Sequence, residues 1–261
     1  ASSQGSTYVL DAAAKKVHKI NSAGQNLLSW DENDGLSLAT NQQEQVYIRT
    51  TSGIKKLTKN GKLLKKISLN SSSVDAAYAK DVAIDKNNYV YINMGKAIHV
   101  YDSDLVFIKT IKTYTSSSAV KFNLIRTIAF NKNNNLFVQT NVAILQLDEN
   151  NKLINRLLLS KLPGNQAIKL YNLAFDASGK PYLSDLSCDC IKQLDWQGNV
   201  VKTLGGFGSL PSQYYAPTVL AFDKNNQLIV GDTGNFRVQK LALAGAAVWT
   251  TSDESNKFKN P

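Results

Sequence analysis

Short apolar segments alternate with polar turns along the whole chain, and one of these segments recurs almost unchanged. Leu173–Asp176 reads LAFD and returns as Leu220–Asp223, with Val82–Asp85 (VAID) and Ile128–Asn131 (IAFN) as variants. Each copy leads into a polar turn and then a second apolar strand. These second strands centre on Tyr8, Tyr47, Tyr91, Phe137, Tyr182 and Ile229, a spacing of 39 to 47 residues. Apolar runs of this length between Asn, Asp and Gly turns predict short β-strands.

A third and a fourth apolar strand complete each unit, after turns such as Asn60-Gly61 and Gln197-Gly198. Four short antiparallel strands in about 40–45 residues are typical of one propeller blade. The sequence therefore predicts an all-β fold, a six-bladed β-propeller of four-stranded antiparallel blades, forming a single domain over residues 1–261. The expected blades are residues 1–32 plus 252–261, 33–72, 78–113, 124–160, 169–206 and 215–251.

The first unit has no first strand of its own. The C-terminal tail around Phe258 weakly repeats the pattern of Phe222-Asp223-Lys224-Asn225. We expect this tail to pair with blade 1 and close the ring, which removes two free sheet edges. The alternative is a disordered tail beside an incomplete blade.

The last unit carries the most distinctive motif. After Pro217, an apolar strand, a turn and a second strand, it reads Asp232-Thr233-Gly234-Asn235-Phe236-Arg237-Val238-Gln239. This resembles the NHL repeat, and the chain is similar to six-bladed propellers of the NHL-repeat family. The resemblance implies that Asp232, Asn235 and Arg237 serve the turn and the contact with neighbouring blades. The full motif occurs once. In unit 5, for example, Cys188 and Cys190 stand where unit 6 has Asn235 and Arg237.

Composition narrows the class of protein. Hydrophobic content of 43% with 19% charged residues argues against a disordered chain. No apolar run approaches the roughly 20 residues of a membrane-spanning helix, so no membrane span is expected. The small polar residues that follow Ala1, with one glycosylation sequon at Asn70-Ser71-Ser72, favour a secreted or extracytoplasmic protein. We expect a monomer.

Few residues offer catalytic or metal-binding chemistry. His18 and His99 hold the same repeat position in different blades, so we do not expect them to meet. We predict no catalytic residue, no metal site and no cofactor. Cys188-Asp189-Cys190 leaves three interpretations open: free thiols in the blade turn, which we prefer, a strained or redox-active disulfide, or soft-metal ligands.

The loops between blades, and those joining second to third strands, should project from one face and bind partners there. Tyrosine and arginine are favoured at such surfaces. The candidate binding residues are Arg49, Tyr78, Lys80, Lys96, Tyr114, Lys121, Arg126, Lys169, Tyr171, Phe207, Tyr214 and Tyr215. Some of these side chains could instead pack against neighbouring blades.

Three functions fit these observations. We favour a non-enzymatic binding propeller that captures a protein or a glycan on this loop face. The net charge of +10 supports an RNA-binding propeller as an alternative, although only four of the 30 basic residues are arginines. A lyase-like or lactonase-like propeller enzyme is the other alternative. The sequence leaves enzymatic activity uncertain, and we favour a protein without it.

Overall fold

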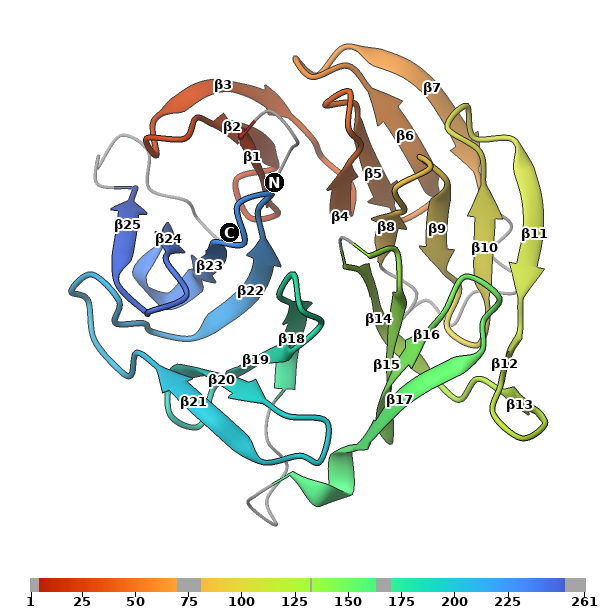
Figure 1. Cartoon of the computed structure of the whole chain (residues 1–261). Coiled ribbons are helices and arrows are strands. Elements are labelled where there is room, and N and C mark those ends of the chain that lie inside the picture. Colours follow the sequence, from red (N-terminus) through yellow and green to blue (C-terminus); the bar gives the residue numbers. More distant parts are fainter. Residues whose placement is uncertain (1–4, 70–80, 132, 163–169, 252–261) are drawn as a thin grey trace. The chain divides into compact units, whose positions relative to one another are not determined.

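The computed structural model describes residues 5–69, 81–131, 133–162 and 170–251 (Figure 1). The expected closure by the C-terminal tail falls on residues 252–261 and lies outside the described residues. Within the described ranges the chain is built of β-strands, with two short 3-10 helices at Leu159–Lys161 and Thr233–Asn235 and no α-helix. None of the described helices is long and apolar enough to cross a membrane.

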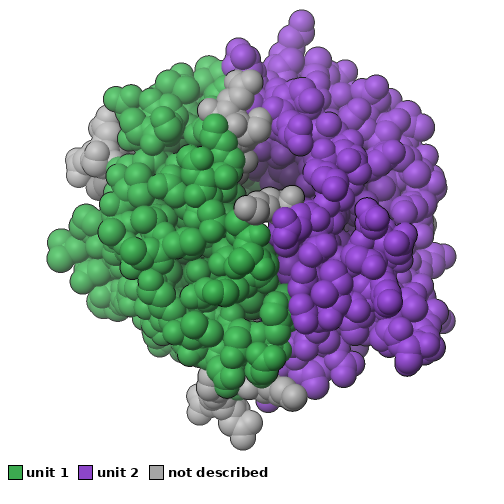
Figure 2. Space-filling view, viewed as in Figure 1, with its two compact units in different colours: residues 1–33, 162–261 green, residues 34–161 purple. Residues whose placement is uncertain are grey.

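The chain divides into two compact units, Ala1–Asn33 with Leu162–Pro261, and Asp34–Lys161 (Figure 2). We number the sheets as blades 1 to 6 in chain order, three in each unit. In the first unit, blade 1 is β1 (Thr7–Asp11), β2 (Lys16–Ile20) and β3 (Asn26–Asp31). Blade 5 is β18 (Leu170–Phe175), β19 (Pro181–Asp185), β20 (Cys190–Leu194) and β21 (Val200–Leu204). Blade 6 is β22 (Pro217–Phe222), β23 (Leu228–Asp232), β24 (Arg237–Leu241) and β25 (Ala247–Thr250).

The second unit holds blades 2, 3 and 4. Blade 2 is β4 (Gly35–Thr40), β5 (Val46–Thr50), β6 (Gly53–Leu57) and β7 (Leu63–Ser68). Blade 3 is β8 (Val82–Ile84), β9 (Val90–Asn93), β10 (Ile98–Tyr101) and β11 (Phe107–Ile111). Blade 4 is β14 (Ile125–Phe130), β15 (Leu136–Thr140), β16 (Ala143–Leu147) and β17 (Leu153–Leu158).

Every blade is an antiparallel meander in which each strand pairs with its neighbours in sequence, as the repeat predicts. The second strand of a blade lies between two others and is covered on both faces, so β5, β15, β19 and β23 are buried at every position. The fourth strand lies at the sheet edge and is far more exposed, as in β7. Burial on both faces explains why each of these second strands begins with adjacent apolar residues, such as Val46-Tyr47-Ile48 in β5 and Leu228-Ile229-Val230 in β23.

One hairpin departs from the expected loops. Between blades 3 and 4, β12 (Thr113–Thr115) and β13 (Ala119–Lys121) form a two-stranded sheet where a loop between blades was predicted. Tyr114 and Phe122 pack together with ring centroids 5.6 Å apart, and both are buried. The hairpin exists because these two aromatic rings give it an apolar side to bury.

The turn from the first strand to the second is closed in the same way in successive blades. The Asp85 carboxylate accepts hydrogen bonds from the backbone N–H groups of Asn87 (2.9 Å) and Tyr89 (2.8 Å). Asp223 does the same for the residues two and four positions later in blade 6, and the side chains of Asn41 and Asn131 do so in blades 2 and 4. An Asp or Asn at this position therefore closes the turn through its own side chain.

Candidate binding surface on blades 5 and 6

The loop joining blade 5 to blade 6, residues 205–216, exposes apolar side chains to solvent. Phe207 is 71% exposed, Leu210 64% and Tyr215 50%. The rings of Phe207 and Tyr215 meet edge to face, with centroids 5.6 Å apart. Exposed apolar side chains that lie together make this loop a candidate interaction surface.

The shape of the loop follows from a tyrosine buried beneath it. Tyr214 is fully buried, and its backbone pairs with the opposite arm of the loop: Tyr214 donates to the Gly206 carbonyl (2.8 Å) and accepts from Gly208 N–H (2.9 Å). Gly205 stands against the Tyr214 ring at a φ of +72°, where a side chain would collide with that ring. Burial, with the Asp232 charge nearby, raises the pKa of Tyr214. Tyr214 therefore holds the loop from within, and its neighbour Tyr215 is turned outward.

A buried carboxylate organises the other side of the loop. Asp232 is fully buried at the end of β23 and accepts hydrogen bonds from the Tyr215 N–H (2.7 Å) and from Arg237 Nε (2.7 Å). The side-chain amides of Asn235 and Gln239 also donate to it, each at about 3.0 Å. A buried carboxylate needs several donors to offset its lost hydration, and here four residues supply them.

The same motif side chains also bind the loop backbone. Arg237 donates to the carbonyl oxygens of Ser209 (2.6 Å), Leu210 (2.9 Å) and Gln213 (2.9 Å). Asn235 donates to the carbonyl of Gly208 at 2.8 Å. These hydrogen bonds fix the backbone that carries Phe207 and Leu210, so the two exposed side chains project from an ordered loop.

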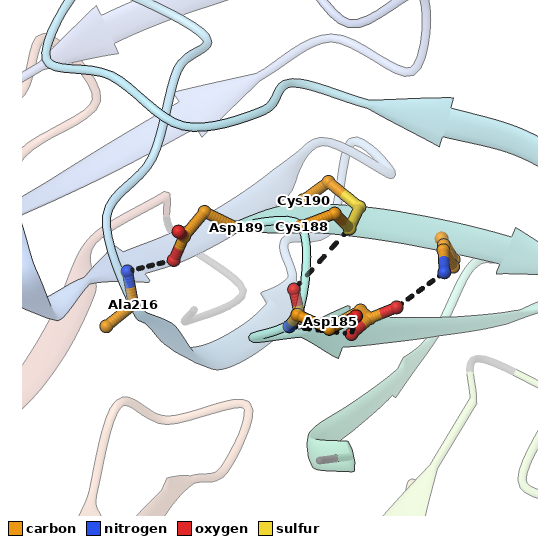
Figure 3. Close-up of a disulfide and its surroundings, with 7 residues drawn as sticks. Asp185, Cys188, Asp189, Cys190 and Ala216 are labelled. Carbon is orange, nitrogen blue, oxygen red and sulfur yellow. Dashed lines mark hydrogen bonds and ion pairs between the residues drawn. A yellow bond between two sulfur atoms is a disulfide. The ribbon is translucent and has the colours of Figure 1, made fainter. Parts of the chain in front are cut away.

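A disulfide joins Cys188 to Cys190 in the turn of blade 5, with their Cα atoms 5.2 Å apart (Figure 3). The preferred expectation of free thiols was therefore wrong. The residue between them, Asp189, takes a left-handed φ of +49°, which turns the chain so that both sulfurs reach the same side. The Asp189 carboxylate accepts a hydrogen bond from Ala216 N–H at 2.6 Å (Figure 3). The disulfide turn thus contacts the end of the loop that carries the aromatic pair.

The disulfide also bears on metal binding. Asp185, Cys188 and Cys190 are the one group of three potential ligands close enough to share an ion in the described part of the chain. Both sulfurs are bonded to each other, and the Asp185 carboxylate pairs with Lys192 at 2.5 Å. The residues present therefore do not fit a bound metal ion in this redox state.

The other candidate residues are dispersed. Arg49 lies in β5 with only 2% of its surface exposed, and it donates to the carbonyl oxygens of Thr50 and Gly53 (2.9 Å for the latter). Burial lowers the pKa of Arg49. Tyr114 is 8% exposed in the hairpin described above. The sequence favoured both residues because charged and aromatic side chains near strand ends look like loop residues.

The remaining candidates are of two kinds. Lys96, Lys121 and Arg126 are exposed in the second unit, outside the aromatic loop. Tyr171 lies in β18, and its side chain is not described; Tyr78, Lys80 and Lys169 lie outside the described residues. Of the twelve candidates, Phe207, Tyr214 and Tyr215 are the ones that the structure brings together.

The two histidines lie in different units. His18 in β2 forms a hydrogen bond with Ser29 (2.9 Å), and His99 in β10 packs against Phe107, with ring centroids 5.6 Å apart. Burial lowers the pKa of both. Neither histidine belongs to a group of potential metal ligands among the described residues.

No family model and no curated protein matches the sequence of this chain. Solved structures do match it. A protein of unknown function from Bacteroides caccae has a TM-score of 0.66 at 15% identity, covering 95% of this chain and 94% of that one. A chain of a nidogen/laminin complex gives 0.64 at 15% identity, covering 96% and 94%. A streptogramin B lyase gives 0.60 at 14% identity, covering 97% and 82%. Likeness at this identity shows the fold alone, and with the sheets described above it makes the chain a six-bladed β-propeller.

Proposed function

We propose that this chain is an NHL-like binding propeller that captures a protein partner with the loop 205–216. The observation that carries the proposal is the exposed pair Phe207 and Tyr215, whose supporting backbone is held by buried side chains. Aromatic side chains that are already ordered lose little conformational freedom on binding, which makes them effective anchors. A single-domain monomer in an oxidising compartment, where a disulfide persists, is part of the same proposal.

The NHL resemblance supports this proposal through the motif of blade 6. Asp232, Asn235 and Arg237 all bind the loop that presents the aromatic pair. A structural neighbour of similar fold was solved in a nidogen/laminin complex, which is an association of proteins. The same fold therefore serves protein binding in at least one neighbour.

The alternatives have less support at this surface. RNA binding needs free cations for the phosphates, but Arg237, the one arginine of blade 6, is already committed to Asp232 and the loop carbonyls. A lyase-like activity is suggested by the streptogramin B lyase neighbour. At this surface, the carboxylates of Asp232 and Asp185 are already paired with Arg237 and Lys192. A glycan could also stack on these aromatic rings, and the experiment below distinguishes a glycan from a protein partner.

The proposal is tested by placing a photo-crosslinking phenylalanine analogue at Phe207 and, as the matched control, at Phe107. Phe107 is also an exposed phenylalanine, with 51% of its surface accessible, but it lies in blade 3. We expect a specific protein adduct from position 207 and not from position 107. With that partner purified, Phe207→Ser should weaken binding at least tenfold, or about 1.4 kcal/mol, while Phe107→Ser leaves it within twofold.

Two results would overturn the proposal. One is unchanged affinity for the purified partner in Phe207→Ser. The other is binding of oligosaccharides, without any protein adduct, that is lost in the same variant, because this would assign the surface to a glycan.

A further inference from the structure

A second site lies in the other unit, where the structure contains a cavity of about 270 Å³ between blades 3 and 4. Tyr91 and Phe130 form an aromatic wall, with ring centroids 4.7 Å apart. The carboxylates of Asp85, Asp148 and Glu149 also line it. Residues of the turns that join first to second and third to fourth strands line the cavity, whereas the binding residues predicted from the sequence lie at the opposite strand ends.

The cavity arises from one substitution in the repeat. In each blade, the second residue of one strand (β1, β5, β9, β15, β19 or β23) pairs with a residue of the strand that follows it. These pairs are Tyr8 with Lys19, Tyr47 with Lys56, Tyr91 with Val100, Phe137 with Gln146, Tyr182 with Gln193, and Ile229 with Lys240. Five blades place a long polar side chain there, and blade 3 places a valine. Val100 lines the cavity.

The long side chains at this position cover the neighbouring ring. Lys19 Nζ lies 5.4 Å from the centroid of Tyr8, and Lys56 Nζ lies 5.9 Å from that of Tyr47. Both lysines are buried despite their charge. In blade 3 the equivalent ring is Tyr91, and Val100 is too short to cover it. The space that a lysine stem fills in blades 1 and 2 is therefore open.

Blade 6 shows what the missing ammonium would contact. Lys240 Nζ lies 2.6 Å from Asp223 Oδ2, and the two side chains are only 5% and 2% exposed. Asp223 holds the same turn position in blade 6 as Asp85 holds in blade 3. Blade 3 thus keeps the carboxylate and lacks its ammonium partner. Asp85 is 6% exposed, and burial raises its pKa despite hydrogen bonds from Tyr89, Asn87 and Asn134 and the nearby charge of Lys86, with which it forms no ion pair in the described structure.

We propose that this cavity binds an external primary alkylammonium group, which takes the place that Lys240 fills in blade 6. The ammonium would pair with Asp85, and its methylene stem would lie against Tyr91 and Val100. The other two carboxylates, Asp148 and Glu149, outweigh the one lining cation, Lys109, so the site attracts cations even though the whole chain carries +10. The cavity volume is just below the roughly 300–1,000 Å³ of pockets for drug-sized ligands, which suits a single extended alkyl chain.

The test titrates the purified full chain with n-pentylammonium, using 1-pentanol as the neutral probe of equal length. The amine should bind at least tenfold more tightly than the alcohol. Val100→Lys supplies an internal ammonium, as in blades 1, 2 and 6, and should weaken amine binding at least tenfold. Asp85→Asn should do the same while keeping its turn, because Asn41 and Asn131 close the equivalent turns.

Matched controls separate this site from general effects. Asp176→Asn makes the same change in the turn of blade 5 and should leave amine affinity within twofold. Phe207→Ser should also leave it unchanged, so the outcome is independent of the proposed protein-binding loop. Equal affinity for amine and alcohol would overturn the inference. So would unchanged amine binding in Val100→Lys.

The ammonium could come from a free polyamine or from a lysine side chain, and two further probes distinguish these sources. Spermidine and a short peptide with one central lysine both carry the group. Tighter binding of either one supports the site and identifies the source. Failure of both to bind at millimolar concentration would overturn the inference.

Discussion

Replacing Asp232 by Asn tests whether one buried carboxylate holds the aromatic loop in place. The change keeps the shape of the side chain but removes its charge, which leaves the Arg237 guanidinium without its ion partner. Removing one member of a buried pair costs about 3–5 kcal/mol. The Arg237 side chain is 13% exposed and keeps its carbonyl acceptors, so the lower end applies. We expect the free energy of unfolding to fall by about 3 kcal/mol, or roughly 6–12 °C in Tm.

Urea denaturation, followed by tryptophan fluorescence, measures the difference in free energy of unfolding between the variant and the wild type. The rate of proteolysis within residues 205–216 measures how well the loop is held. The matched control is Asp195→Asn, at a turn carboxylate that accepts hydrogen bonds from Gln197 and Asn199 without an ion pair in the described structure. That variant should lose less than about 1 kcal/mol, the size of one ordinary hydrogen bond. If Asp232→Asn were no less stable than Asp195→Asn, or if its loop resisted proteolysis as the wild type does, the reasoning would be refuted. Combining it with Arg237→Met should cost less than the sum of the two single changes, because no unpaired charge then remains.

Two further predictions concern the same unit. Gly205→Ala should destabilise the protein by about 2 kcal/mol or more, because Gly205 has a positive φ and a Cβ would lie 2.6 Å from the nearest backbone carbonyl oxygen. In the control Gly206→Ala, the added Cβ meets nothing within 4 Å, so the free energy of unfolding should change by no more than about 0.5 kcal/mol in the same denaturation assay. Equal losses of stability in the two variants would contradict this prediction. Burial raises the pKa of Asp185, but hydrogen bonds from Lys192 and Ser187 outweigh it and hold that pKa below the ordinary value. Its stabilising effect is therefore present above about pH 4 and is lost as the pH falls through the lowered pKa, so the stability gap between wild type and Lys192→Met should narrow below about pH 4. A gap that stays constant from pH 7 to pH 3 would show that this ion pair does not contribute.

The strands of this fold could be predicted from the sequence because each blade repeats the same local pattern. Leu220–Asp223 and its copies mark the first strands, and the turns after them contain residues that close such turns through their own side chains. The hairpin of β12 and β13 was missed because it belongs to no repeat. Its only sequence signal is the pair Tyr114 and Phe122, and these rings meet only when the hairpin forms.

The candidate surface could be predicted only in part. Phe207 and Tyr215 were identified because they are aromatic residues in a loop. The same reasoning included Tyr214, which is buried. Where two aromatic residues are adjacent in a loop, the sequence does not indicate which of them points inward. Arg49 was included for its charge and is buried as well. The cavity of blade 3 was not predicted, although its origin is visible in the sequence: Val100 stands out only after the third strands are aligned in register with the second.

The meander topology has a consequence for how this protein folds. Since every described strand pairs with its neighbour in sequence, each hairpin closes over only a few residues, and the entropy lost in closing such short loops is small. A blade can therefore form from its own stretch of chain before the others exist. Only the packing of one blade against the next requires distant segments to meet. We expect hydrogen exchange during refolding to protect strands β14 to β17 as one group and β22 to β25 as another, each with its own rate.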